Sequence, residues 1–153
     1  MNVKLTDTMP RIDFYVLEET AATARLTYAC RLIEKAHKNR HRIYINAEDS
    51  LQANQLDELL WTYRDDSFLP HNLYGEGPEP APPIQIGFQV TPLNHRDILL
   101  NLSTTVPEFF PQFSRIFEIV TNEASIQTAG REHYRHYRAC GHDISTHKLQ
   151  TIE

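Results

Sequence analysis

Four side chains near the end of the sequence would bind an anion if they lay together on a helix. Arg131, Tyr134, Arg135 and Arg138 follow one another at intervals of one to three residues, so that helical geometry would gather them on one side. Guanidinium groups form charge-assisted, often paired, hydrogen bonds with carboxylates and phosphates. The spacing therefore predicts a docking surface for an anion, while a merely solvated charged face is the alternative reading of the same pattern.

The segment from Asn122 to Gly141 has the signals of such a helix. Asn122 is a residue type that caps a first turn, and Gly141 is one that ends a last turn. The remaining periodic positions would face the core, and they are Ile126, Ala129, His133, Tyr137 and Cys140. The four-residue stripe would then point roughly away from the core.

Length and charge limit the classes of function. A chain of 153 residues suits one domain, and no apolar run approaches the roughly 20 residues that span a bilayer. The first residues lack a secretory signal, so a cytoplasmic protein is expected. The net charge of −5 disfavours general binding to nucleic acid, because a phosphate backbone would repel the molecule. A local positive stripe on a negative protein favours a small anionic target.

The residue types of a metal site or a disulfide framework are incomplete. Cys30 and Cys140 each fall on an apolar helix face and are expected to be free, buried thiols. The densest histidines lie beside arginines and lack a cysteine or carboxylate to complete a ligand set; they are His133, His136, His142 and His147. We expect no metal ion and no cofactor.

A catalytic constellation does not assemble either. The segment from Gly75 to Pro78 is no phosphate loop, because the third glycine is missing and Pro78 lacks an amide donor. The adjacent Asp65 and Asp66 would point apart, and the Gly-x-Ser-x-Gly nucleophile motif is absent. A non-enzyme is the expectation.

The elements that position these residues alternate between strand and helix. Strands are predicted at 12–17, 42–46, 84–88, 97–102 and 115–121, and helices at 22–39, after the Asp49 cap, at 107–113 and at 122–141. This alternation is typical of parallel strands joined by crossover helices. Residues 142–153 are predicted to be a loosely ordered tail.

Residues 64–83 interrupt the pattern. Five prolines and two glycines in this stretch predict a long ordered loop without a regular element. Trp61 and Phe68 belong to a group of aromatic and apolar residues around this loop. Each one alone could pack in the core, but as a group they favour a partner surface.

Several of these segments together resemble one known family. They are Asp57–Trp61, Ser67–Leu73 followed by Gly75–Pro78, Arg96–Leu99, and Gly130–Arg138. The succession of Trp, Phe-Leu-Pro-His-Asn-Leu and Gly-Glu-Gly-Pro is specific, and the likeness extends from about Ile12 to His147. The chain resembles the chi subunit of bacterial DNA polymerase III.

The resemblance implies a single α/β domain over residues 1–153, with residues 1–10 as an extension of unknown role. Its fold would be a Rossmann-like three-layer sandwich with a mostly parallel central sheet and no dinucleotide-binding loop. Its function would be that of a non-catalytic accessory subunit of the clamp loader in DNA replication. Its partners would be the psi subunit and the acidic, phenylalanine-ending C-terminal tail of single-stranded DNA-binding protein, with no direct nucleic acid and no membrane.

The family's tail-binding positions correspond to Val120, Arg131 and Tyr134. By this resemblance Arg131 would hold the terminal carboxylate of the tail, and the other two would line the pocket for its last ring. Arg135 and Arg138 are our own extension of that site, toward upstream acidic residues of the tail.

Two further points follow from the resemblance. Trp61 and Phe68 look like the surface that family members turn toward psi, or toward a helicase-like protein. Relatives can carry a lysine where this chain has Gln127, so the affinity for the tail would be weaker here or distributed differently.

Two alternatives to this function remain at the level of the sequence. One is an enzyme that handles a small phosphorylated ligand at the strand ends, with Arg96 and the histidines as its polar groups. The other is a direct binder of single-stranded DNA that uses Tyr134 and the stripe arginines.

Overall fold

A seven-stranded parallel sheet forms the centre of the structure, a computed structural model that describes residues 10–66 and 68–149. The strands are β1 (Arg11–Leu17), β2 (Ile43–Asn46), β3 (His71–Leu73), β4 (Ile84–Gly87), β5 (Ile98–Asn101), β6 (Arg115–Val120) and β7 (Ile144–Leu149). Their order is β3-β4-β2-β5-β6-β1-β7. Every pairing between them is parallel, so the predicted α/β fold class is confirmed and the sheet is more regular than predicted.

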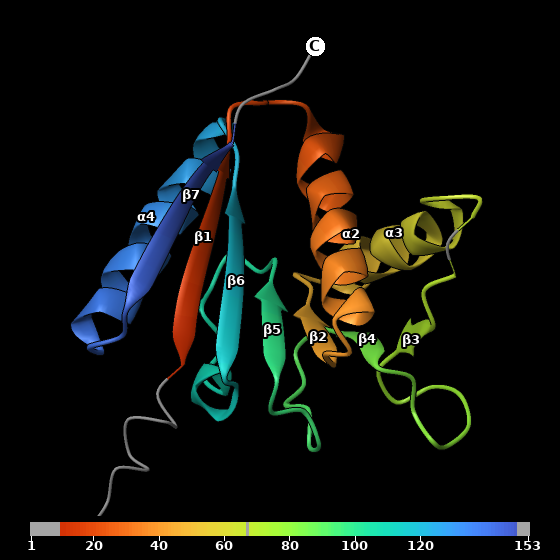
Figure 1. The fold of residues 1–153 in the computed structure, drawn as a ribbon. Helices are drawn as coiled ribbons and strands as arrows, with labels where there is room; N and C mark the ends of the chain where they lie inside the picture. The colour runs from red at the N-terminus through yellow and green to blue at the C-terminus, as the bar shows by residue number, and fades with distance from the viewer. Residues whose placement is uncertain (1–9, 67, 150–153) are drawn as a thin grey trace, which may run out of the picture.

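Helices cover both faces of this sheet. The helices are α2 (Ala22–Lys38), α3 (Ser50–Thr62) and α4 (Ala124–Ala139), with a short 3-10 turn, η1 (Phe110–Gln112). Alternate residues of a strand point to opposite faces, and the core divides accordingly. Leu100 packs with α2 and α3 in one cluster, whereas its neighbour Leu99 packs with Tyr137 of α4 in the other. In Figure 1, α4 lies beside β7 and β1, and α2 and α3 lie toward the opposite edge of the sheet.

The helix boundaries follow local signals in one case and tertiary contacts in another. The predicted Asp49 cap of α3 is confirmed, because its carboxylate accepts a hydrogen bond from the Gln52 amide at 2.9 Å. The predicted Asn122 cap of α4 is wrong. The Asn122 amide instead donates to the Glu18 carbonyl oxygen, which fixes the loop before the helix. The helix starts after Glu123 and ends before Gly141, whose φ of +87° is the left-handed conformation expected at a helix end.

The predicted loose tail is wrong for residues 144–149, which form strand β7 at the edge of the sheet. Ile144 pairs with Ile12 and Leu149 with Leu17 of β1. The sequence Ile-Ser-Thr-His-Lys-Leu is polar because β7 has only one neighbouring strand and is partly exposed. Residues 150–153, like residues 1–9, lie outside the described part of the chain.

The prediction of no regular element in residues 64–83 is also wrong, because the short strand β3 lies within this segment. Pro70 directly precedes it, a position where a missing amide hydrogen is tolerated. His71 is buried, and its Nδ1 lies 2.6 Å from the Leu69 carbonyl oxygen. The strand pairs only with β4, which explains why it is too short for a periodic pattern.

Two side chains of α4 differ from the predicted division of its faces. Cys140 is exposed, because the buried stripe of the helix ends one turn earlier, at Tyr137. Tyr134 is half-buried rather than turned away from the core, and its ring meets Phe14 of β1 edge-on with centroids 5.5 Å apart. None of the described helices is long and apolar enough to cross a membrane.

Candidate functional site

A hollow of about 270 Å³ lies between α4 and the sheet. Residues of four elements line it: Phe14 and Val16 of β1, Val120 of β6, Thr146 of β7, and Gln127, Gly130, Arg131 and Tyr134 of α4. The parallel register brings the sheet residues together, since Val16 pairs with Val120 and Phe14 pairs with Thr146. The structure therefore places Val120, Arg131 and Tyr134, the positions that the family resemblance indicated, around one cavity.

The close approach of α4 to β6 depends on a glycine. A Cβ atom on Gly130 would lie 2.8 Å from the Cγ2 atom of Val120, closer than carbon atoms normally approach. Glycine within a helix costs about 1 kcal/mol relative to alanine. The contact with Val120 gives a structural reason for it here, because a larger residue would push the helix away from the hollow.

The hollow combines an apolar floor with a cationic rim. Phe14, Val16 and Val120 of the sheet form an apolar floor, Tyr134 of α4 forms an aromatic wall, and Arg131 is exposed beside them. Within residues 10–66 and 68–149, Arg131 forms no salt bridge, and neither do Arg135 and Arg138. An aromatic side chain with a nearby carboxylate fits this arrangement.

Arg135 and Arg138 occupy a different position from Arg131. Both are exposed on α4, but neither lines the hollow. Their helical spacing from Arg131 continues the cationic surface along the helix. They are therefore placed to meet an extended part of a ligand outside the cavity.

Sequence reasoning missed Phe14, Val16, Thr146 and Gly130. Phe14 and Val16 looked like ordinary residues of a buried strand, and Thr146 lay in the supposed tail. Gly130 carried a usable signal, because glycine in the middle of a helix is unfavourable and implies a close contact.

A buried polar network holds α4 against the sheet beneath the hollow. The carboxylate of Glu118 accepts hydrogen bonds from the Tyr137 hydroxyl at 2.6 Å and from the Asn101 side-chain amide at 3.0 Å. His133 Nδ1 lies 3.0 Å from the other Glu118 oxygen, and His133 Nε2 lies 2.9 Å from the Thr104 carbonyl oxygen. These bonds fix the helix that carries Arg131.

The network also changes the protonation of its members. Burial lowers the pKa of His133, but the hydrogen bond and the negative charge of Glu118, with the Thr104 bond, outweigh burial and raise this pKa overall. Both ring nitrogens face oxygen acceptors, so the charged imidazolium satisfies both. Burial, followed by the charge of Glu118, raises the pKa of Tyr137 well above its ordinary value. The raised pKa of His133 favours its charged form beside Glu118, as in a structural ion pair.

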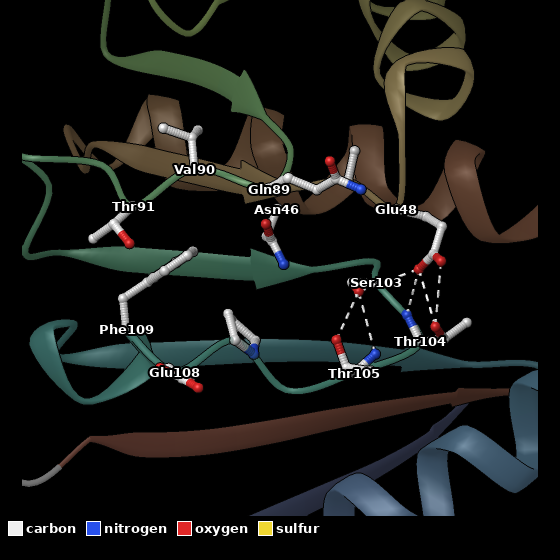
Figure 2. Close-up of a pocket in the computed structure, with 12 residues that line it drawn as sticks. Asn46, Glu48, Gln89, Val90, Thr91, Ser103, Thr104, Thr105, Glu108 and Phe109 are labelled. Carbon is white, nitrogen blue, oxygen red and sulfur yellow. Dashed lines mark hydrogen bonds between the residues drawn. The ribbon is translucent and has the colours of Figure 1, made fainter.

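A second cavity, of about 450 Å³, lies at the carboxyl ends of β2 and β5. Figure 2 shows Glu48 reaching across it to the loop after β5. The Glu48 carboxylate accepts hydrogen bonds from the Thr104 amide at 2.7 Å, the Thr104 hydroxyl at 3.1 Å and the Ser103 hydroxyl at 3.2 Å. A protein carboxylate therefore occupies donors that a phosphate would need.

The composition of this cavity also disagrees with the phosphorylated-ligand alternative. Its lining contains Glu48 and Glu108 but no arginine, lysine or histidine. Arg96 precedes β5, at the amino ends of the strands, and donates a hydrogen bond to the His95 carbonyl oxygen. The polar groups named for that alternative do not meet at the cavity. No group of three or more histidine, cysteine or acidic side chains among the described residues is arranged to hold a metal ion.

The two aromatic residues predicted for a second partner lie together on the surface. Trp61 at the end of α3 is 55% exposed and Phe68 is 69% exposed, and their ring centroids are 6.0 Å apart. His71 packs on the inner side of Trp61 with centroids 4.5 Å apart. The pair forms an exposed apolar patch, remote in sequence from the hollow beside α4.

The fold and the hollow thus define an α/β protein with a small apolar and cationic pocket and without a dinucleotide-binding loop. Comparison with known proteins narrows this class to one family. The family model described as "DNA polymerase III chi subunit, HolC" matches residues 9–145. A DNA polymerase III subunit chi of Pseudomonas aeruginosa is 41% identical over 144 residues, which cover 94% of this chain and all of that protein.

Two other curated proteins with the same description are similar. The one from Escherichia coli K12 is 34% identical over 90% of this chain and 97% of its own length. The one from Haemophilus influenzae is 32% identical over 89% of this chain and 95% of its own length. The chain belongs to the DNA polymerase III chi subunit family, and its role is that of a subunit in DNA replication.

Proposed function

We propose that this chain is a non-catalytic adaptor that connects the psi subunit of the clamp loader with the acidic C-terminal tail of single-stranded DNA-binding protein. The observation that carries the proposal is the hollow beside α4. It combines an apolar cavity for one aromatic ring with a guanidinium group that has no ionic partner in the described part of the chain.

In this proposal the last phenylalanine ring of the tail enters between Val120 and Tyr134. Its terminal carboxylate binds Arg131 through charge-assisted hydrogen bonds. Upstream acidic residues of the tail pass over Arg135 and Arg138, outside the hollow. Gln127 also lines the hollow and holds Asn122 through a 3.2 Å hydrogen bond, so it supplies polarity but no charge. A large part of the electrostatic affinity therefore rests on Arg131.

The psi subunit, or a helicase-like protein at the same surface, would bind the exposed Trp61 and Phe68 pair. Large aromatic rings anchor interfaces because they bury much apolar area for little side-chain entropy. The two surfaces are separate, so one chain would engage both partners at the same time.

Calorimetry with two peptides tests the tail site. One is a short acidic peptide that ends in phenylalanine, and the other is the same peptide without that residue. Only the first should bind. Arg131→Ala should weaken its binding by about 2 to 5 kcal/mol, the usual cost of truncating one partner of a charged pair, because the bound peptide would bury this pair.

Arg96→Ala is the matched control, since it removes one exposed guanidinium at the amino ends of the strands. Its peptide affinity should stay close to that of the unmodified chain. Equal affinity of both peptides, or an Arg131→Ala variant that binds normally, would reject the proposed tail site.

A further inference from the structure

A basic groove lies on the other face of the sheet from α4, along α2. It consists of two adjoining hollows, of about 460 Å³ and about 90 Å³. They share Tyr15, Leu32, Lys35 and Asn39, so they form one continuous depression. Neither hollow contains a residue of the proposed tail site.

The charge of this groove is opposite to that of the whole chain. Five cationic side chains and one carboxylate line the groove, which gives it a formal excess of four positive charges. The net charge of the whole chain is −5. The cations are Arg31, Lys35, Lys38, Arg64 and Arg115. The carboxylate, Glu34, is buried and is already shared by Lys38 and Arg64 at 3.7 and 3.3 Å. Arg31 and Lys35 are exposed and form no salt bridge within the described residues.

Aromatic rings lie beside these cations. Tyr15 stacks on the His147 ring with centroids 4.8 Å apart and planes 17° apart, and the Tyr28 ring follows at 5.6 Å. The Arg115 guanidinium lies 5.1 Å from the Phe117 ring centroid and is held by the buried Asp13 carboxylate at 2.9 Å. The rings are therefore held in place without a ligand.

We propose that this groove binds single-stranded DNA, with the bases against Tyr15 and Tyr28 and the phosphates along Arg31 and Lys35. A cationic track beside aromatic platforms is the usual arrangement for binding a single strand without regard to sequence. An acidic peptide would satisfy the cations but would leave the rings unused, so the rings favour nucleic acid. The net charge of the chain, which predicts no nucleic-acid partner, averages over the molecule and does not describe this face.

The affinity of the groove is expected to be low, because few phosphates are neutralised and the rest of the molecule is acidic. Binding to the coating protein would place the groove close to DNA and raise the effective concentration of the strand. The inference itself does not depend on the tail site, since it concerns bare DNA and other residues.

Fluorescence anisotropy with a labelled thymidine 20-mer, without any other protein, tests the groove. The chain should bind this probe at low salt, and the double variant Arg31→Ala with Lys35→Ala should bind at least tenfold more weakly. For single strands the logarithm of the binding constant falls with the logarithm of salt by about 0.7 per neutralised phosphate. The double variant should therefore show a slope about 1.4 smaller.

The matched control is the double variant Arg135→Ala with Arg138→Ala, which removes the same charge from α4 and should bind the probe nearly normally. Exchange of the two groove cations, Arg31→Lys with Lys35→Arg, should retain binding, and Tyr28→Leu should weaken it at least about fivefold through lost stacking.

Three results would overturn the proposal. The first is that the bare strand does not bind at low salt. The second is that the two alanine double variants lose the same amount of affinity for the strand. The third is that a polyglutamate peptide binds as tightly as the strand and that Tyr28→Leu does not weaken the binding of this peptide. The last result would assign the groove to an acidic protein segment.

Discussion

Replacing Gly130 by alanine tests how α4 is held above the hollow. The added Cβ atom would lie 2.8 Å from the Val120 Cγ2 atom, whereas carbon atoms in contact are about 3.5 to 4.0 Å apart. The helix or the valine must therefore move by roughly 1 Å. Overpacking of this kind costs about 1 to 3 kcal/mol, and alanine returns about 1 kcal/mol through its helix propensity. The free energy of unfolding should fall by about 0 to 2 kcal/mol.

The affinity for the tail peptide should respond more strongly than stability. Arg131 and Tyr134 belong to the same helix, so a displaced α4 moves the cationic rim and the aromatic wall together while Val120 stays in the sheet. We expect a loss of at least about 1.4 kcal/mol in binding, which is a factor of ten. Calorimetry with the phenylalanine-ending peptide measures this loss, and urea unfolding measures stability.

A double-mutant cycle separates the contact from helix propensity. Val120→Ala removes the methyl group that the new Cβ would meet, so the double variant should be more stable than the sum of the single changes predicts, by about 0.5 to 3 kcal/mol. Thr128→Ala, at an exposed position of the same helix, reports the effect of propensity alone. If Gly130→Ala stabilised the chain like Thr128→Ala, bound the peptide normally and were additive with Val120→Ala, the reasoning would be refuted.

Three further predictions concern other parts of the molecule. Phe68→Ala should weaken capture of psi in a pull-down and leave tail binding unchanged, and a joint loss would contradict the two separate surfaces. Burial, with the charge of Arg42, lowers the pKa of His95 to about 4, so neutral His95 is favoured in the folded chain. The stability that neutral His95 provides is present above about pH 6.5 and is lost as the pH falls toward 4, and the loss is roughly 3 kcal/mol. His95→Gln should therefore flatten the pH dependence of the free energy of unfolding in that range, as measured by urea unfolding. An unchanged pH dependence would refute the lowered pKa of His95. Cys140 is exposed, whereas burial raises the pKa of Cys30 to about 12. A thiol reagent should therefore modify only Cys140 in the native chain but both cysteines in urea. Rapid modification of both cysteines in the native chain would contradict the structure.

Local patterns in the sequence were sufficient to predict the alternating α/β order. The strand periodicity of two and the helix periodicity of 3.6 depend only on which side chains face the core, so β1, α2 and α3 were found near their observed bounds. The Asp49 cap and the Gly141 helix end were also predictable, because each depends on the backbone within a few residues. The spacing of Arg131 and Tyr134 placed them on one helix face for the same reason.

The tertiary structure alone decided which strands lie next to that helix. Strand β7 is polar and has no strong pattern of its own, because pairing with β1 satisfies its backbone while its side chains stay partly exposed. That pairing brings Thr146 to the hollow, and the parallel register brings Phe14 and Val120 there from segments about 100 residues apart. Such contacts depend on strand order, which local spacing does not encode. The sequence by itself therefore determined the cationic helix face, and packing across the sheet made the cavity beside it.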